Sequence, residues 1–252
     1  LALIILGVKA GDTVFCQSIT FSASANPIAY QGAIPVFIDS EIDTWNMDPI
    51  LLKAALEEAK ENAELPKAII PVHLYGMPAK MNEIISIAKE YGVPVIEDAA
   101  EALGSSIENK PCGSFGEFGV LSFNGNKIIT TSGGGALLSN DGEMIEKARF
   151  LSTQARDSAP HYQHSQIGYN YRMSNVLAGI GRGQLEVLND RVIARRNNYE
   201  RYTHYFSKQN NAGFKIQFQE EPDGYHSNRW LTCILVDPIS NKGLTREIIR
   251  LE

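Results

Sequence analysis

A single lysine, Lys127, stands where its amine could take part in chemistry. It follows an apolar segment at residues 119–123 and an Asn-Gly turn, and two isoleucines and three glycines (133–135) come after it. A lone lysine is usually just a solvated charge, because lysines are normally exposed. In apolar surroundings, however, an amine loses hydration, which suits it to forming a Schiff base with an aldehyde. The glycines would let backbone or ligand approach closely.

A carboxylate, Asp98, comes at the end of another apolar segment, residues 93–96. Fixed behind a buried strand, it could pair with a buried cationic nitrogen, although Asp is also a favoured N-cap of a helix. A lysine for an imine and an aspartate for a pyridinium nitrogen are what pyridoxal phosphate requires of its protein. The chain has no G-x-G-x-x-G and no Walker pattern, which argues against dinucleotide and P-loop sites.

The segments that would position these residues alternate along the chain. Their strands are apolar on both sides, which is typical of a mostly parallel sheet covered by helices on both faces. In an open sheet of this kind, ligands bind beyond the carboxyl ends of the strands. The fold class is therefore predicted as α/β. The expected strands are 13–16, 35–38, 68–72, 93–96 and 119–123, and the expected helices are 24–30, 49–60 and 80–91.

The second half of the chain is organised differently. We expect a Gly-rich strand at 133–138, a helix at 141–151, a long loop at 152–170, a helix at 174–206 bent near 189–190, and a strand at 230–236. These elements divide the chain into a large domain, residues 1–190, and the beginning of a smaller α+β domain, residues 191–252. Residues 1–6 are interpreted as the last turns of a helix stopped by Gly7, and the chain as a piece of a longer protein.

Composition narrows the function classes. The 252 residues include 23 basic and 29 acidic side chains, giving a net charge of −6, and no apolar run approaches the roughly 20 residues that span a bilayer. We therefore expect neither a nucleic-acid nor a membrane partner. Three widely spaced cysteines, Cys16, Cys112 and Cys233, favour a reducing, cytoplasmic setting.

The histidines offer weaker signals. His161 and His164 are three residues apart in the long loop, but no Cys or carboxylate pattern accompanies them, so no metal site is predicted. His73 follows an expected strand. The sequence fits two interpretations of it equally well, a residue that lines the crevice and a hydrogen-bonded histidine of the core.

With these residues in view, the chain resembles the DegT/DnrJ/StrS family of nucleotide-sugar aminotransferases. The matching segments occur in the family's order and cover nearly the whole chain up to about residue 200. They are residues 11–14, 18–26, 71–76, 96–104, 122–135 and 168–175. The resemblance implies the aspartate-aminotransferase-like fold of pyridoxal-phosphate-dependent transferases, a three-layer α/β/α large domain followed by a small C-terminal domain.

The resemblance also implies roles for three residues of this sequence. Lys127 would form the Schiff base with the cofactor and later move a proton between substrate and cofactor. Asp98 would pair with the ring nitrogen, and Glu101 would lie beside the phenolic oxygen. Many members carry Gln at the position of Glu101, so this carboxylate either stays protonated or accepts a bond from a protonated phenol.

Three further residues follow from the same resemblance. Phe21 would lie against the face of the cofactor, and Ser122 would donate its hydroxyl to the phosphate. Asn170 would reach the phosphate of the neighbouring subunit in a homodimer with shared active sites. Tyr169, Tyr171 and Arg172 are expected at that interface or at the substrate, with the cap of the following helix as the alternative.

Within the family, three segments are most similar to the UDP-N-acetylbacillosamine-type 4-aminotransferases: residues 123–131, 152–156 and 227–230. The resemblance thus implies transfer of an amino group from an amino acid, glutamate, to a UDP-linked 4-keto-6-deoxy-N-acetylhexosamine. The alternatives are amination at carbon 3, or a silent cofactor-binding module. A dehydratase is disfavoured, because that branch carries His in place of Lys127. The family's Gly-Thr-Ala-like phosphate segment is not in this sequence, so the chain as given is expected to bind cofactor poorly.

Overall fold

Six strands form one twisted sheet in the computed structural model, which describes residues 1–211 and 215–251. The order is β2-β1-β3 followed by β4-β7-β8, and bridges from Ile69 to Val95 and from Val72 to Asp98 join the two halves in parallel. All pairings are parallel except that of β8 with β7. The strands are β1 (Thr13–Gln17), β2 (Ile34–Ile38), β3 (Ile69–Ile70), β4 (Ile96–Asp98), β7 (Phe118–Ser122) and β8 (Gly135–Leu138).

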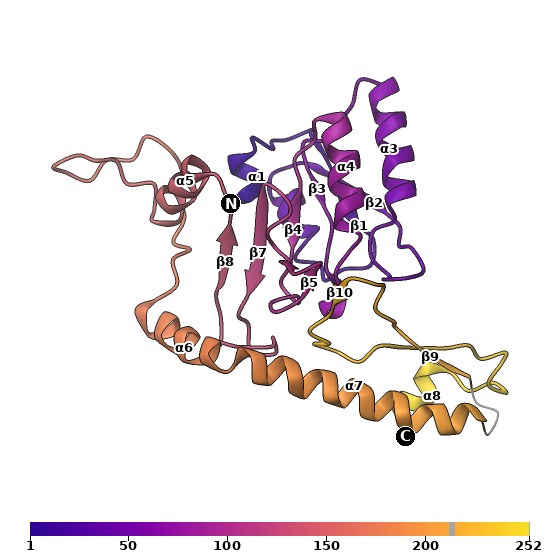
Figure 1. Cartoon of the computed structure of the whole chain (residues 1–252). Coiled ribbons are helices and arrows are strands. Elements are labelled where there is room, and N and C mark those ends of the chain that lie inside the picture. Colours follow the sequence, from indigo (N-terminus) through magenta and orange to yellow (C-terminus); the bar gives the residue numbers. More distant parts are fainter. Residues whose placement is uncertain (212–214, 252) are drawn as a thin grey trace.

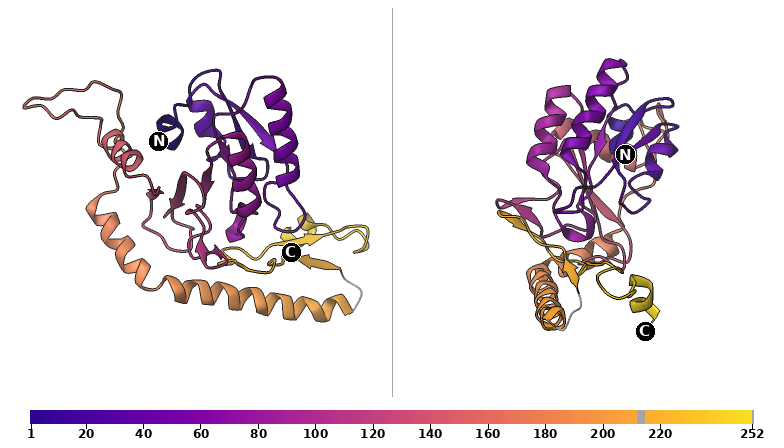
Figure 2. Two further views of the ribbon diagram at one scale, coloured as in Figure 1. Left: turned by 45° about the horizontal axis from the view of Figure 1, so that its top comes forward. Right: turned by 90° about the vertical axis from the view of Figure 1, so that its right-hand side faces the viewer.

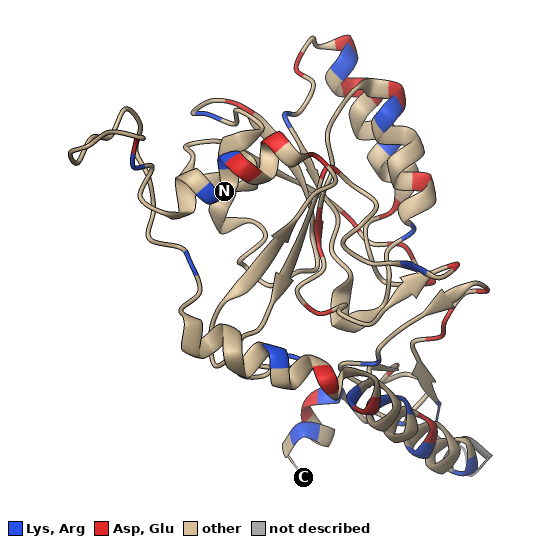
Figure 3. Cartoon of the chain, turned by 60° about the vertical axis from the view of Figure 1, so that its left-hand side comes forward, with Lys and Arg blue, Asp and Glu red and all other residues tan. Residues whose placement is uncertain are grey.

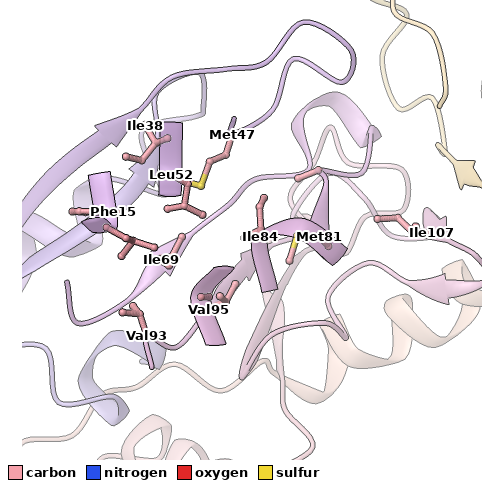
Figure 4. Close-up of a cluster of buried hydrophobic side chains, with 13 residues drawn as sticks. Phe15, Ile38, Met47, Leu52, Ile69, Met81, Ile84, Val93, Val95 and Ile107 are labelled. Atoms are coloured by element: carbon pink, nitrogen blue, oxygen red, sulfur yellow. The ribbon is translucent and has the colours of Figure 1, made fainter. Parts of the chain in front are cut away.

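Helices cover both faces of this sheet, as the doubly apolar strands predict. Along β1, Phe15 packs into a cluster with α3 (Pro49–Glu61) and α4 (Met81–Tyr91) (Figures 1 and 4). The neighbouring Val14 and Cys16 pack on the other face of the sheet. That second face is covered by α1 (Ala2–Ile5), α2 (Asn26–Tyr30) and α5 (Gly142–Ser152). The three-layer α/β/α architecture is therefore confirmed.

Local sequence signals fix several helix ends. The Asp48 carboxylate accepts from the backbone N–H of Ile50 (2.7 Å) at the start of α3, and Asp141 does the same for Glu143 (2.9 Å) at the start of α5. These caps satisfy amides that have no partner within the helix. The α4 helix ends at Gly92, whose φ of +67° suits a residue without a side chain.

The C-terminal part of the chain runs along one end of the sheet (Figures 1 and 2). Between the sheet and this part, residues 153–174 form the expected long loop, which projects away from the body in both figures. Two helices follow, and short strands and turns then return toward the sheet. Their bounds are α6 (Asn175–Glu186), α7 (Leu188–Asn211), β9 (Ile216–Phe218), β10 (Tyr225–His226), β11 (Ile234–Val236) and α8 (Arg246–Leu251), with η1 (Leu74–Gly76), β5 (Ser106–Ile107) and β6 (Lys110–Pro111) lying earlier in the chain.

Two expectations for this region were wrong in detail. The helix expected at 174–206 is two helices that meet at Val187, slightly before the expected bend, and the second continues to Asn211. The strand expected at 230–236 begins only at Ile234. Trp230 cannot join a ladder there because its N–H donates to the side chain of Asn228 (2.8 Å).

Glycine is required where the last strands of the sheet meet. A Cβ on Gly135 would lie 2.4 Å from the carbonyl oxygen of Leu121 in the neighbouring strand. This explains the position of the Gly-rich run at the start of β8. Among the described residues, no helix is both long enough and apolar enough to cross a membrane.

Candidate active site

The predicted site residues gather where β4 and β7 end. These strands are parallel neighbours, and Asp98, the last residue of β4, is paired in register with Val120. Glu101 follows Asp98 on the next turn. Lys127 lies in the loop between β7 and β8, which is closed by a bond from the Thr131 N–H to the Phe123 carbonyl (2.9 Å). Parallel strands present their carboxyl ends at one edge, so the sheet brings these residues together.

Asp98 is held by two donors and borders a cavity. The hydroxyl of Ser24 donates to its Oδ2 (2.5 Å), and the Ala100 N–H donates to its Oδ1 (3.1 Å). The cavity, of about 590 Å³, is lined by Asp98 and Ser24 together with Leu121 and Tyr171. A carboxylate fixed in this way beside a cavity is suited to bind a cationic nitrogen.

Lys127 lies against a second carboxylate rather than against Asp98. Its Nζ is 3.4 Å from Glu101 Oε1, and the two side chains are only 13% and 11% exposed. The ring centroid of Trp230 lies 4.6 Å from the same nitrogen. The amine is thus largely withdrawn from solvent, in contrast to an ordinary surface lysine. Within the described chain, Lys127 is not part of the wall of the cavity that Asp98 borders.

Glu101 is itself oriented by the backbone of Tyr75. The Tyr75 N–H donates to Glu101 Oε2 (2.7 Å). Tyr75 has a φ of +57°, a conformation rare for a residue with a side chain, and such strain is often found at functional sites. Burial, followed by the charges of Cys233 and Glu101, raises the pKa of the Tyr75 phenol.

Of the remaining predicted residues, only Ser122 lies at the end of one of these strands, and none of them has a recorded contact with Lys127 in the described structure. Ser122 is the last residue of β7, and its Oγ accepts from the Asn124 N–H (3.4 Å). Phe21 lies in the loop after β1 and is 73% exposed. Asn170 is exposed at the neck of the projecting loop, where its backbone is bridged to Thr153.

His73 proves to be a core residue rather than a crevice residue. Its ring is fully buried, with Nε2 3.1 Å from Glu97 Oε2 and Nδ1 accepting from the Ala79 N–H (3.0 Å). Because Nδ1 accepts, the proton lies on Nε2, which donates to Glu97. Of the two loop histidines, His164 places Nδ1 2.9 Å from the Gln154 carbonyl oxygen. No cluster of three or more metal-binding side chains occurs among the described residues.

Three residues of the site were missed by the sequence interpretation: Ser24 on Asp98, Tyr75 on Glu101, and Trp230 on Lys127. Ser24 and Tyr75 lie within segments that match the family, so a search for donors near each carboxylate could have suggested them. Trp230 lies in the segment 227–230 that resembles the bacillosamine-type branch and is a rare aromatic in a polar stretch, but neither signal gave it a role. Tyr169 and Tyr171 stack with ring centroids 4.9 Å apart, and the following helix is capped by Ser174 rather than by either of them.

A mostly parallel sheet between two layers of helices, with a largely buried lysine amine at its carboxyl edge, is the fold of aminotransferase-like α/β proteins. The model of the DegT/DnrJ/EryC1/StrS aminotransferase family matches residues 1–250, and the chain belongs to that family. It is 60% identical over 237 residues to EpsN of Bacillus subtilis, whose name describes a pyridoxal phosphate-dependent aminotransferase. That match covers 94% of this chain and 60% of EpsN.

Two other similarities agree with this assignment. A GDP-perosamine synthase of Caulobacter vibrioides is 42% identical over 195 residues, which cover 77% of this chain and 51% of that protein. The structure of a DegT DnrJ EryC1 StrS aminotransferase from Brucella abortus superposes with a TM-score of 0.86 at 34% identity, covering 93% of this chain and 62% of the other. The chain therefore spans about three fifths of the length of such relatives.

Proposed function

We propose that this protein is a pyridoxal-phosphate-dependent aminotransferase that moves an amino group from an amino acid, L-glutamate, to a nucleotide-linked keto sugar. The observation that carries the proposal is the amine of Lys127, which is largely buried and 3.4 Å from Glu101 at the carboxyl edge of the sheet. A surface lysine would not be held in this way. The family membership and the names of EpsN and the perosamine synthase support the same activity.

The residues present fit the cofactor. Asp98, fixed by Ser24 and bordering the cavity, would hold the ring nitrogen, and Lys127 would bond to the aldehyde carbon. Ser122 would donate to the phosphate, because its oxygen accepts only a long bond from Asn124 and the hydroxyl hydrogen can point to a ligand. Phe21, exposed after β1, would cover the ring.

The cofactor supplies an aldehyde and a ring that accepts electrons when a proton leaves the substrate carbon. The Asp98 carboxylate would accept a hydrogen bond from the ring nitrogen and so favour its protonated form. Lys127 would serve as the general base and acid that moves a proton between substrate and cofactor. The low exposure of Lys127 and Glu101 keeps bulk water from competing for that proton.

Glu101 has donors on both oxygens, and this bears on the two roles left open for it. Tyr75 N–H donates to Oε2 and the Lys127 amine approaches Oε1. Both contacts favour an acceptor over a donor. We therefore propose that Glu101 accepts a hydrogen bond from the phenol of the cofactor rather than donating one.

We further propose that the acceptor substrate is a UDP-linked 4-keto-6-deoxy-N-acetylhexosamine. The support is the similarity of residues 123–131, 152–156 and 227–230 to aminotransferases of that type. In the structure these segments form the Lys127 loop, the base of the projecting loop and the stretch that carries Trp230. The first and third meet at the Lys127 amine, and Ser152 of the second lines the cavity that Asp98 borders.

The substrate assignment is tested with a panel of keto sugars. Full-length protein is incubated with glutamate, pyridoxal phosphate and UDP-, dTDP- or GDP-linked 4-keto or 3-keto sugars, and 2-oxoglutarate is measured. We expect the UDP-linked 4-keto N-acetyl sugar to be aminated with the highest kcat/KM. Consumption of only a dTDP-linked 3-keto sugar would contradict the substrate, and no turnover with any sugar would contradict the aminotransferase activity.

We also propose a homodimer in which Asn170 of one subunit completes the partner's site. Large apolar side chains are exposed on α6 and on the projecting loop, including Val176, Ile180, Tyr162 and Ile167, and both elements carry few charges (Figure 3). Exposed apolar patches of this kind mark interaction sites.

In mixed dimers in which one subunit carries Asn170→Ala, the change should impair the active site of the other subunit. Such dimers should therefore retain about half the activity. Full activity would contradict shared sites.

We propose that the large domain ends at residue 190, which falls in the first turn of α7. Residues 1–190 would carry the cofactor site and 191–252 would begin the small domain. The cytoplasm is the proposed location, because widely spaced cysteines are typical of a reducing compartment.

A further inference from the structure

Trp230 reaches Lys127 from the C-terminal part of the chain. Its indole N–H donates to the carbonyl oxygen of Asn126 (2.8 Å), the residue directly before Lys127. Its ring centroid lies 4.6 Å from Lys127 Nζ, and Trp230 is only 6% exposed. The hydrogen bond therefore fixes the orientation of a ring that already contacts the amine.

Asn228 ties the backbone of Trp230 to the turn that bears Glu101. Its Oδ1 accepts from the Trp230 N–H (2.8 Å), and its Nδ2 donates to the carbonyls of Glu101 (2.8 Å) and Leu103 (2.9 Å). Asn228 is completely buried. A single buried amide thus holds Trp230 and the Glu101 turn at a fixed separation.

Residues 228–231 also contact Tyr75, the strained residue that orients Glu101. The Leu231 N–H donates to the Tyr75 carbonyl (3.4 Å), while the Tyr75 N–H donates to Glu101. Next to Tyr75, a Cβ at Gly76 would lie 1.9 Å from Asn228 Oδ1. Only glycine at position 76 permits this approach. Residues 228–231 are therefore packed directly against Tyr75 and Lys127, the two residues that contact the Glu101 carboxylate.

We propose that Trp230 is a positioning residue for the Lys127 amine. The face of its ring attracts the ammonium group by a cation–π interaction and holds it against Glu101 whenever the nitrogen carries no substrate or cofactor carbon. The position to which the amine returns is thereby set by the C-terminal part of the chain. This inference deepens the proposed aminotransferase function, and its catalytic meaning rests on that function.

The competing explanation is that Trp230 only fills space. It does pack in a small apolar cluster with Ile128, Val192 and partly buried neighbours. A purely packing role would change stability without changing the chemistry of Lys127 in the folded protein. The two explanations therefore differ in how readily the Lys127 amine reacts.

The test measures that reactivity in full-length protein from which cofactor has been removed. Reductive methylation by formaldehyde and cyanoborohydride is followed by peptide mass spectrometry, and the rate at Lys127 is divided by that at exposed Lys9. We expect Trp230→Leu to raise this ratio about threefold to tenfold, because the ring no longer covers the amine and holds it against Glu101. Trp230→Phe, which keeps a ring, should stay within about twofold of the parent.

Trp45→Phe is the matched control, because Trp45 is the only other tryptophan, and it should leave the ratio unchanged. An unchanged ratio in Trp230→Leu would overturn the proposal, and so would an equal rise in Trp230→Phe or Trp45→Phe. Thermal unfolding confirms that each variant is folded under the labelling conditions.

A second measurement holds even if Trp230→Leu does not fold. In the Trp45→Phe background Trp230 is the one tryptophan left in this sequence, and its emission is followed with excitation that favours tryptophan over the ten tyrosines. Lys127→Met should change this emission, since a thioether replaces the ammonium beside the ring. Unchanged emission would overturn the contact. Neither measurement uses cofactor or sugar, so failure of the proposed function would show in the sugar panel and failure of this inference would show here.

Discussion

Replacing Lys127 with Ala is expected to lower transamination by at least about 10⁴-fold, because the variant loses both the nucleophile and the group that moves the proton. The fold should survive, since the Lys127 Nζ contacts Glu101 and Trp230 at the edge of the sheet rather than in its core. Turnover of glutamate and keto sugar by the full-length protein is the measurement. Thermal unfolding is used to check that the variant is folded at the assay temperature.

Two controls sharpen this prediction. Lys127→Arg keeps a cation for Glu101 and Trp230 but cannot form an imine, so it should be as inactive as the Ala variant. Lys9→Ala removes an exposed lysine and should leave activity unchanged. Substantial activity in Lys127→Arg would show that the charge of Lys127 matters and its nucleophilicity does not.

Glu97→Gln is expected to destabilise the protein by about 2–4 kcal/mol, because buried donors that lose their acceptor cost about 1–3 kcal/mol each. The carboxylate is fully buried and accepts from His73 and from the amides of Gly113 (2.7 Å), Phe115 and Gly116 (2.7 Å). An amide side chain would turn an N–H toward one of these donors. Denaturant unfolding at pH 7 measures the loss, and exposed Glu90→Gln should change stability by less than about 0.5 kcal/mol.

Glu97 should also make the stability of the protein depend on pH. Burial by itself would raise the pKa of Glu97, but the hydrogen bonds from His73 and from the Gly116 and Gly113 amides outweigh burial and lower it. Its contribution is therefore complete above the ordinary value of 4.5 and is lost as the pH falls through the lowered value. The difference in stability between wild type and Glu97→Gln should shrink in acid. Parallel curves down to pH 3 would contradict this.

Much of the large domain could be predicted from the sequence because its signals are local. Strands apolar on both sides imply helices on both faces, and Asp48 before Pro49 fixes the start of α3. Lys127 and Asp98 could be singled out because each follows a buried strand, and parallel strands end at one edge. The antiparallel direction of β8 could not be foreseen, since an apolar run carries no sign of direction.

The missing parts of the site depend on contacts between distant residues. Trp230 meets Asn126 across 104 positions, and Asn228 meets Glu101 across 127, so no local pattern announces either contact. The late start of the expected strand has a local cause instead, because the Trp230 N–H is taken by Asn228, two residues earlier in the chain. Glu97 was overlooked for a related reason. Apart from His73, its hydrogen-bond donors are backbone amides of a loop, and every sequence carries such amides, so no residue type points to them.

The most direct test of the central claim is to reduce full-length protein with borohydride in the presence of pyridoxal phosphate and to map the adduct by mass spectrometry. The account predicts a yellow protein that bleaches on reduction and a pyridoxyl group on Lys127 alone. A stable adduct on another lysine, with Lys127 unmodified, would contradict it.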